Sequence, residues 1–92
     1  MALRVGPYTF SDVIYDEPSD VLYATIGRLA ESRREQTPEG HLWHFDERGR
    51  FRGITLMSPR EQLERQGAVY VSLPTGELER VQGAELELRT RS

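Results

Sequence analysis

Alternating apolar and polar residues predict two β-hairpins in the first part of the chain. Residues 8–26 contain two runs rich in β-branched and aromatic side chains, joined by a short turn that makes the strands antiparallel. Residues 41–57 show the same pattern on either side of Glu-Arg-Gly-Arg, where Gly49 suits a turn closed by a glycine bulge. The polar segment near 31–37 fits either a loop or an edge strand. Its Arg and Glu side chains favour the edge strand, because they discourage unwanted strand pairing.

A start signal and a stop signal delimit one short helix, about 58–66. Ser58 is expected to be the N-cap, Pro59 the first helical residue and Glu61 the partner of Ser58 in a capping box. Gly67 is expected to end the helix. Because the segment is short and has few apolar residues, the helix needs a sheet to pack against.

The last part of the chain predicts a β-meander over about 68–90. Its strands are expected at 68–73, 77–81 and 84–90, with a Pro-Thr-Gly turn after the first of them. A short helix at 77–82 is the alternative for the middle strand.

Together these elements predict an α+β fold that is mostly antiparallel β-sheet: hairpins 8–26 and 41–57, one short helix about 58–66 and the meander about 68–90. The chain of 92 residues is expected to form one domain, residues 1–92. Chains divide into separate cores only beyond roughly 250 residues.

The composition excludes several kinds of chemistry. The chain has no Cys, which excludes disulfides and zinc–thiolate sites, and no Lys, which excludes Schiff-base chemistry. The net charge of −3 makes nucleic acid the least favoured partner. The absence of Cys and Asn suits a heat-loving source, although the exclusive use of Arg equally suits a GC-rich genome.

Two histidines and an aspartate lie close together in the sequence, as they do in many metal sites. On a β-strand, however, side chains alternate between the two faces, so His41 and His44 point to opposite sides of the sheet. The remaining pair, His44 with Asp46, lacks a third ligand. We therefore expect no metal and no cofactor.

Aromatic residues of the second hairpin form the first candidate surface. A turn over 46–49 would place Phe45 opposite Phe51 and Trp43 opposite Gly53. These side chains are expected in the core or, if one face of the sheet stays uncovered, at a dimer or partner interface. In the second case the interaction surface comprises Trp43, Phe45, Phe51, Arg50 and Arg52.

Carboxylates crowd the turn of the first hairpin. Asp16, Glu17 and Asp20 would suit acid–base work or a divalent cation. Aspartate is also an ordinary turn residue whose side chain binds nearby backbone amides, and we expect this structural role.

Residues 13–26 and 44–57 together resemble a small prokaryotic family catalogued as domain of unknown function 2283. The matching positions are Tyr15, Asp16, Asp20, Leu22, Tyr23, Asp46, Gly49, Arg50, Gly53 and Ile54. The resemblance covers about 10–66, and the sequence departs from the family pattern at His44 and Thr55. It implies a compact domain that is largely β-sheet. Some members of the family are encoded near small toxin-like proteins, which suits an antitoxin-like or partner-binding role.

These observations predict a cytoplasmic, non-enzymatic interaction module, without a signal peptide or membrane segment, that forms a homodimer. One alternative is an antitoxin-like protein that binds a small toxin. The other is a small metal-dependent or acid–base enzyme that uses the Asp16/Asp20 turn or His44.

Overall fold

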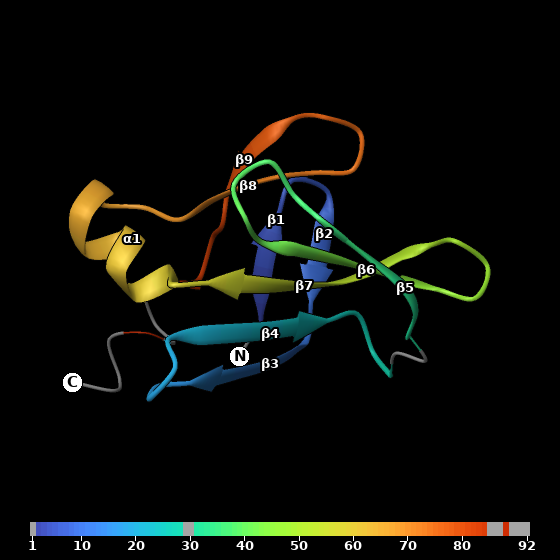
Figure 1. Ribbon diagram of the computed structural model, residues 1–92, viewed down its shortest axis with the longest axis horizontal. Helices are drawn as coiled ribbons and strands as arrows, with labels where there is room; N and C mark the ends of the chain where they lie inside the picture. The colour runs from blue at the N-terminus through green and yellow to red at the C-terminus, as the bar shows by residue number, and fades with distance from the viewer. Residues whose placement is uncertain (1, 29–30, 85–87, 89–92) are drawn as a thin grey trace.

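The computed structural model, which describes residues 2–28, 31–84 and 88, is mostly antiparallel β-sheet with one short helix (Figure 1). This confirms the predicted α+β class. The elements, in chain order, are β1 (Leu3–Val5), β2 (Tyr8–Phe10), β3 (Asp12–Asp16), β4 (Val21–Thr25), β5 (Glu31–Gln36), β6 (Leu42–Asp46), β7 (Phe51–Met57), α1 (Pro59–Gln66), β8 (Tyr70–Ser72) and β9 (Leu78–Arg80).

A five-stranded antiparallel sheet with the order β3-β4-β7-β6-β5 forms the largest element of the fold. Strand β7 is central in this sheet, with β3 and β5 at its edges (Figure 1). The edge strand predicted near 31–37 is β5. Two further hairpins, β1–β2 and β8–β9, are linked to each other through a bridge between Arg4 and Gln82.

The core lies between one face of the five-stranded sheet and the two smaller hairpins. From the sheet, strands β4 and β7 bury the alternate residues Leu22, Ala24, Ile54 and Leu56. The smaller hairpins contribute Leu3, Val5, Phe10, Val71 and Val81 to the same cluster. The β1–β2 hairpin runs across the direction of β4 and β7 in Figure 1. One face of the sheet is therefore the inner wall of the core.

The turn of the β6–β7 hairpin forms as predicted, but its register differs from the prediction. Gly49 has a φ of 78°, and Phe45 lies opposite Phe51. Beyond that pair the register shifts by one residue, so Trp43 lies opposite Ile54 and not opposite Gly53. Arg52 is the extra residue on β7, and it bonds to Ile26, which follows β4. The Arg52 carbonyl accepts from the Ile26 amide at 2.8 Å, and the Arg52 guanidinium donates to the Ile26 carbonyl at 2.8 Å.

Helix α1 occupies the predicted residues but is capped differently at its N-terminus. Ser58 stands at the N-cap with φ 55° and ψ 46°, and its side chain makes no capping hydrogen bond. The side chain of Glu61 pairs with Arg65 at 3.3 Å, so the predicted capping box is wrong. A capping box needs an extended backbone at the N-cap residue. Ser58 has a positive φ instead, so its hydroxyl is not placed to accept from the helix amides. The predicted stop is confirmed, since the Gly67 amide donates to the Leu63 carbonyl at 2.8 Å.

Both ends of the chain add detail that the sequence pattern did not predict. The first of the two runs predicted within 8–26 is divided at Ser11, because its first half, β2, pairs with the unpredicted strand β1. Near the C-terminus the residues of β9 pair with β8, so the alternative helix at 77–82 is wrong. The third strand of the meander, 84–90, falls mainly on residues outside those the structure describes.

Candidate interaction surface

Of the aromatic residues proposed for an interface, Phe45 is buried, and Trp43 and Phe51 are partly buried against the core. Phe45 is 6% exposed, and Trp43 packs against the core while its indole N–H donates to the Ser72 carbonyl at 2.8 Å. Phe51 meets Tyr8 edge-on, with 4.9 Å between the ring centroids. These contacts are the ones expected if the aromatic side chains belong to the core, and they leave little aromatic surface for a partner.

The two arginines of the predicted surface are bound within the hairpins. The Arg50 guanidinium contacts the Asp46 carboxylate at 2.9 Å, and the Arg50 amide donates to the same carboxylate at 2.9 Å. The hydrogen bond from that amide is the largest of the effects that lower the pKa of Asp46. Arg52 is held by the Ile26 carbonyl. These arginines stabilise the hairpin tip and its connection to β4.

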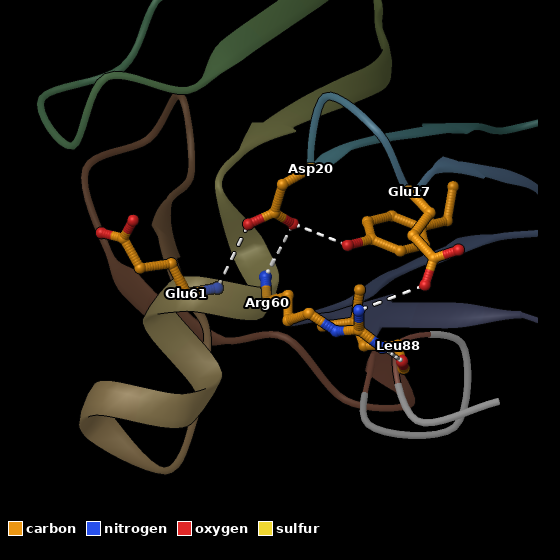
Figure 2. A network of polar contacts seen from close by, with 6 residues as sticks. Glu17, Asp20, Arg60, Glu61 and Leu88 are labelled. Carbon is orange, nitrogen blue, oxygen red and sulfur yellow. Dashed lines mark hydrogen bonds and ion pairs between the residues drawn. The ribbon is translucent and has the colours of Figure 1, made fainter. Parts of the chain in front are cut away.

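The turn carboxylates join the first hairpin to helix α1 (Figure 2). One oxygen of Asp20 accepts from the Tyr15 hydroxyl at 2.8 Å and from the Arg60 amide at 3.0 Å, and the other accepts from the Glu61 amide at 3.2 Å. Glu17 forms an ion pair with the Arg60 guanidinium at 3.2 Å. Asp20 thus supplies, from another element, the cap that Ser58 does not supply.

Asp16, the third member of the cluster, accepts a hydrogen bond from Ser19 in the same turn. Burial, reinforced by the Asp20 carboxylate, raises the pKa of Tyr15 to about 12. The tyrosine therefore stays protonated near neutral pH and acts as a donor to Asp20. Asp20 is occupied by helix amides and a phenol, which leaves it little capacity for acid–base chemistry.

The two histidines make separate contacts. The His41 Nδ1 atom accepts from the Met57 amide at 3.0 Å, and the His44 Nε2 atom lies 2.6 Å from the Thr55 hydroxyl. Both imidazoles are buried. Within the described ranges 2–28 and 31–84, together with residue 88, no group of three or more His, Cys, Asp or Glu side chains is arranged to hold a metal ion.

Three of the four large apolar side chains that are exposed among the described residues lie on the other side of the five-stranded sheet. We call this side, which faces away from the core, the outer face. Ile14, Tyr23 and Met57 are 68%, 47% and 44% exposed there. A shallow hollow of about 430 Å³ occupies its centre. The hollow is lined by Val21, Tyr23, Thr25, Arg34, Leu42, His44, Ile54, Thr55 and Met57.

The outer face was not predicted from the sequence, because the exposure of its side chains depends on contacts between distant segments. Strand alternation in β4 carries the signal, since Leu22 and Ala24 enter the core while Tyr23 points the other way. The alternation shows that the strand has two different faces. The packing of the β1–β2 and β8–β9 hairpins determines which of the two faces lies in the core.

Comparison of the chain with protein-family models, with curated proteins and with solved structures found no match. The resemblance to domain of unknown function 2283 therefore stays a prediction. No helix in the described part of the chain is long and apolar enough to cross a membrane. The described residues form an α+β fold in which the outer face of the sheet exposes Ile14, Tyr23 and Met57.

Proposed function

We propose that this protein is a small, non-enzymatic interaction module that forms a homodimer through the outer face of its five-stranded sheet. The observation that supports the proposal is the group of exposed apolar side chains on that face, Ile14, Tyr23 and Met57. Burying a large apolar side chain fully stabilises a complex by roughly 1.5–3 kcal/mol. A second copy presents an equal apolar surface, so pairing two outer faces removes both from water.

The hydrogen bonds and ion pairs that the candidate catalytic residues make within the chain also favour a binding role over a catalytic one. Asp20 caps helix α1, Glu17 pairs with Arg60, and His41 accepts from a backbone amide. An acid–base enzyme needs such groups directed toward a substrate. The enzymatic alternative at the Asp16/Asp20 turn therefore has weaker support than an interaction role.

Analytical ultracentrifugation over micromolar to sub-millimolar concentrations tests the proposal. We expect a reversible equilibrium that reaches the mass of a dimer. Ile14→Glu is expected to shift this equilibrium to monomer, because it places a charge on the apolar surface that the dimer buries. A monomer at every concentration overturns the homodimer. A small basic protein that binds in its place, and whose binding Ile14→Glu abolishes, supports the antitoxin-like alternative.

Leu78→Glu is the matched control for this variant. Leu78 is 60% exposed, close to the 68% of Ile14, but it lies on β9 and outside the outer face. The two substitutions remove the same kind of side chain and add the same charge. Equal effects of both on association would contradict the assignment to the outer face.

A further inference from the structure

The charged residues of the outer face lie at its two opposite edges. Strand β3 presents Asp12 and Asp16, both exposed, beside Ile14, while its other residues Val13 and Tyr15 pack toward the core. At the far edge Arg34 on β5 is exposed and lines the hollow. Between these edges, the residues of β4, β7 and β6 that line the hollow include no Asp, Glu or Arg.

One row of paired residues connects the two charged edges. Asp12 pairs with Thr25, Thr25 with Gly53, Gly53 with His44, and His44 with Arg34. Asp12 and Arg34 therefore stand at the same height along the strands, on opposite sides of the central strand β7. Four strand spacings separate them, or about 19 Å. The face is thus self-complementary in charge about β7.

This symmetry distinguishes between two ways of pairing two copies face to face. A two-fold axis parallel to β7 sets β3 of one copy over β5 of the other, and brings Asp12 against Arg34 at two equivalent places. A two-fold axis across the strands sets β3 over β3 and β5 over β5, so that like charges meet at both edges. Attraction in the first arrangement and repulsion in the second favour the axis along β7.

The apolar centre of the face fits the same axis. In the next row Ile14 pairs with Tyr23, Tyr23 with Thr55, and Thr55 with Leu42. Because β4 and β6 lie on either side of β7, the axis sets Tyr23 of one copy above Leu42 of the other. Leu42 lines the 430 Å³ hollow, which gives the half-exposed tyrosine ring a place to enter.

We propose that the homodimer is a face-to-face β-sandwich whose two-fold axis runs along β7, with Asp12 of each copy paired with Arg34 of the other and Tyr23 seated in the opposite hollow. The proposal rests on the proposed homodimer and specifies its geometry. Sheets packed in this aligned way keep their strand directions within about 30° of each other, as the natural twist of each sheet requires.

Charge reversal at the two edges tests the geometry. Asp12→Arg alone and Arg34→Asp alone each turn both contacts into repulsions, and we expect each to raise the dimer dissociation constant by about tenfold or more. The double variant restores both attractions, and we expect its dissociation constant to lie within about threefold of that of the unchanged protein. A mixture of the two single variants is expected to form the heterodimer in preference to either homodimer, as observed by native mass spectrometry.

Arg48→Asp is the control, because Arg48 is exposed in the β6–β7 turn and the substitution changes the net charge by the same amount as Arg34→Asp. We expect it to leave the dissociation constant within about twofold of the original. Circular dichroism of each variant establishes that the fold is retained. A dimer that the single reversals do not weaken overturns the axis along β7 and leaves the proposed homodimer standing. A protein that is monomeric without any substitution overturns both.

Discussion

At the scale of single residues, Asp20 connects two elements that lie about forty residues apart in the chain. Its carboxylate receives the Tyr15 hydroxyl and two helix amides, those of Arg60 and Glu61, and its carbonyl accepts from the Ser58 amide at 2.8 Å. Its φ of 53° lies in the left-handed region that Asp tolerates better than most residues. One side chain thus joins the β3–β4 turn to the start of α1.

Asp20→Ala is therefore expected to lower the free energy of unfolding by about 2–3 kcal/mol, because it removes a helix cap and leaves the Tyr15 hydroxyl unpaired. Asp20→Asn keeps the tolerance for positive φ and one acceptor oxygen, so it should fall between Ala and the unchanged protein. Asp16→Ala is the control, since Asp16 bonds only within its turn in the described structure. Urea unfolding measures all three. Equal losses for the two alanine variants would contradict the capping role.

His41 is expected to make the free energy of unfolding depend on pH in the mildly acidic range. Burial lowers its pKa from the usual 6.5, against the opposing effects of the Tyr70 carbonyl and the Glu39 charge. The unfolded chain therefore binds a proton more readily than the folded one. The free energy of unfolding should be constant with respect to this group above pH 6.5, should fall as the pH drops below 6.5, and should level off below the lowered pKa.

Denaturation at about pH 7.5 and about pH 5.5 measures this effect. His41→Gln removes the titrating group, so the loss of stability between the two pH values should be smaller in the variant than in the unchanged protein. An unchanged loss would assign the acid sensitivity to other groups.

At the scale of elements, Ser72 joins strand β8 to the neighbouring sheet. The Glu39 carboxylate, in the loop before β6, accepts from the Ser72 amide at 2.9 Å and from its hydroxyl at 2.6 Å. The Ser72 carbonyl accepts from Trp43 on β6. Burial alone would raise the pKa of Glu39, but hydrogen bonds from Ser72, from the Thr37 side chain and from the backbone of Glu39 itself together outweigh it and lower the pKa.

Glu39→Gln is expected to lower the free energy of unfolding at neutral pH by about 1–2 kcal/mol, because charge-assisted hydrogen bonds become neutral ones. Since the folded pKa is lowered, the stabilisation is present above the unfolded value of 4.5 and is lost as the pH falls through the folded pKa. The difference between the variant and the unchanged protein should shrink in acid. A difference independent of pH would point to lost packing instead.

The local sequence pattern predicted most of the helices and strands. The errors in the helix cap and in the hairpin register arise from contacts between residues far apart in the chain. Alternation and turn residues located β4, β5 and the β6–β7 hairpin, because each depends on neighbours in sequence. The helix cap was misassigned because Asp20, the residue that supplies it, lies about forty positions earlier in the chain. The shifted register at Arg52 likewise depends on Ile26, which belongs to another hairpin. For the candidate site, alternation separated Tyr23 from Leu22, but only the packing of the smaller hairpins shows which of them is exposed.

At the scale of the whole molecule, the five-stranded sheet buries one face within the chain and leaves the other as an apolar surface. If two chains cover that surface together, unfolding also separates them, and the stability depends on protein concentration. The melting temperature should then rise by roughly 4 °C for each tenfold increase in concentration, given the unfolding enthalpy typical of two chains of this length. Ile14→Glu should abolish the dependence while Leu78→Glu retains it. Differential scanning calorimetry at two concentrations measures the shift, and a melting temperature that is the same at both would contradict coupled folding and association.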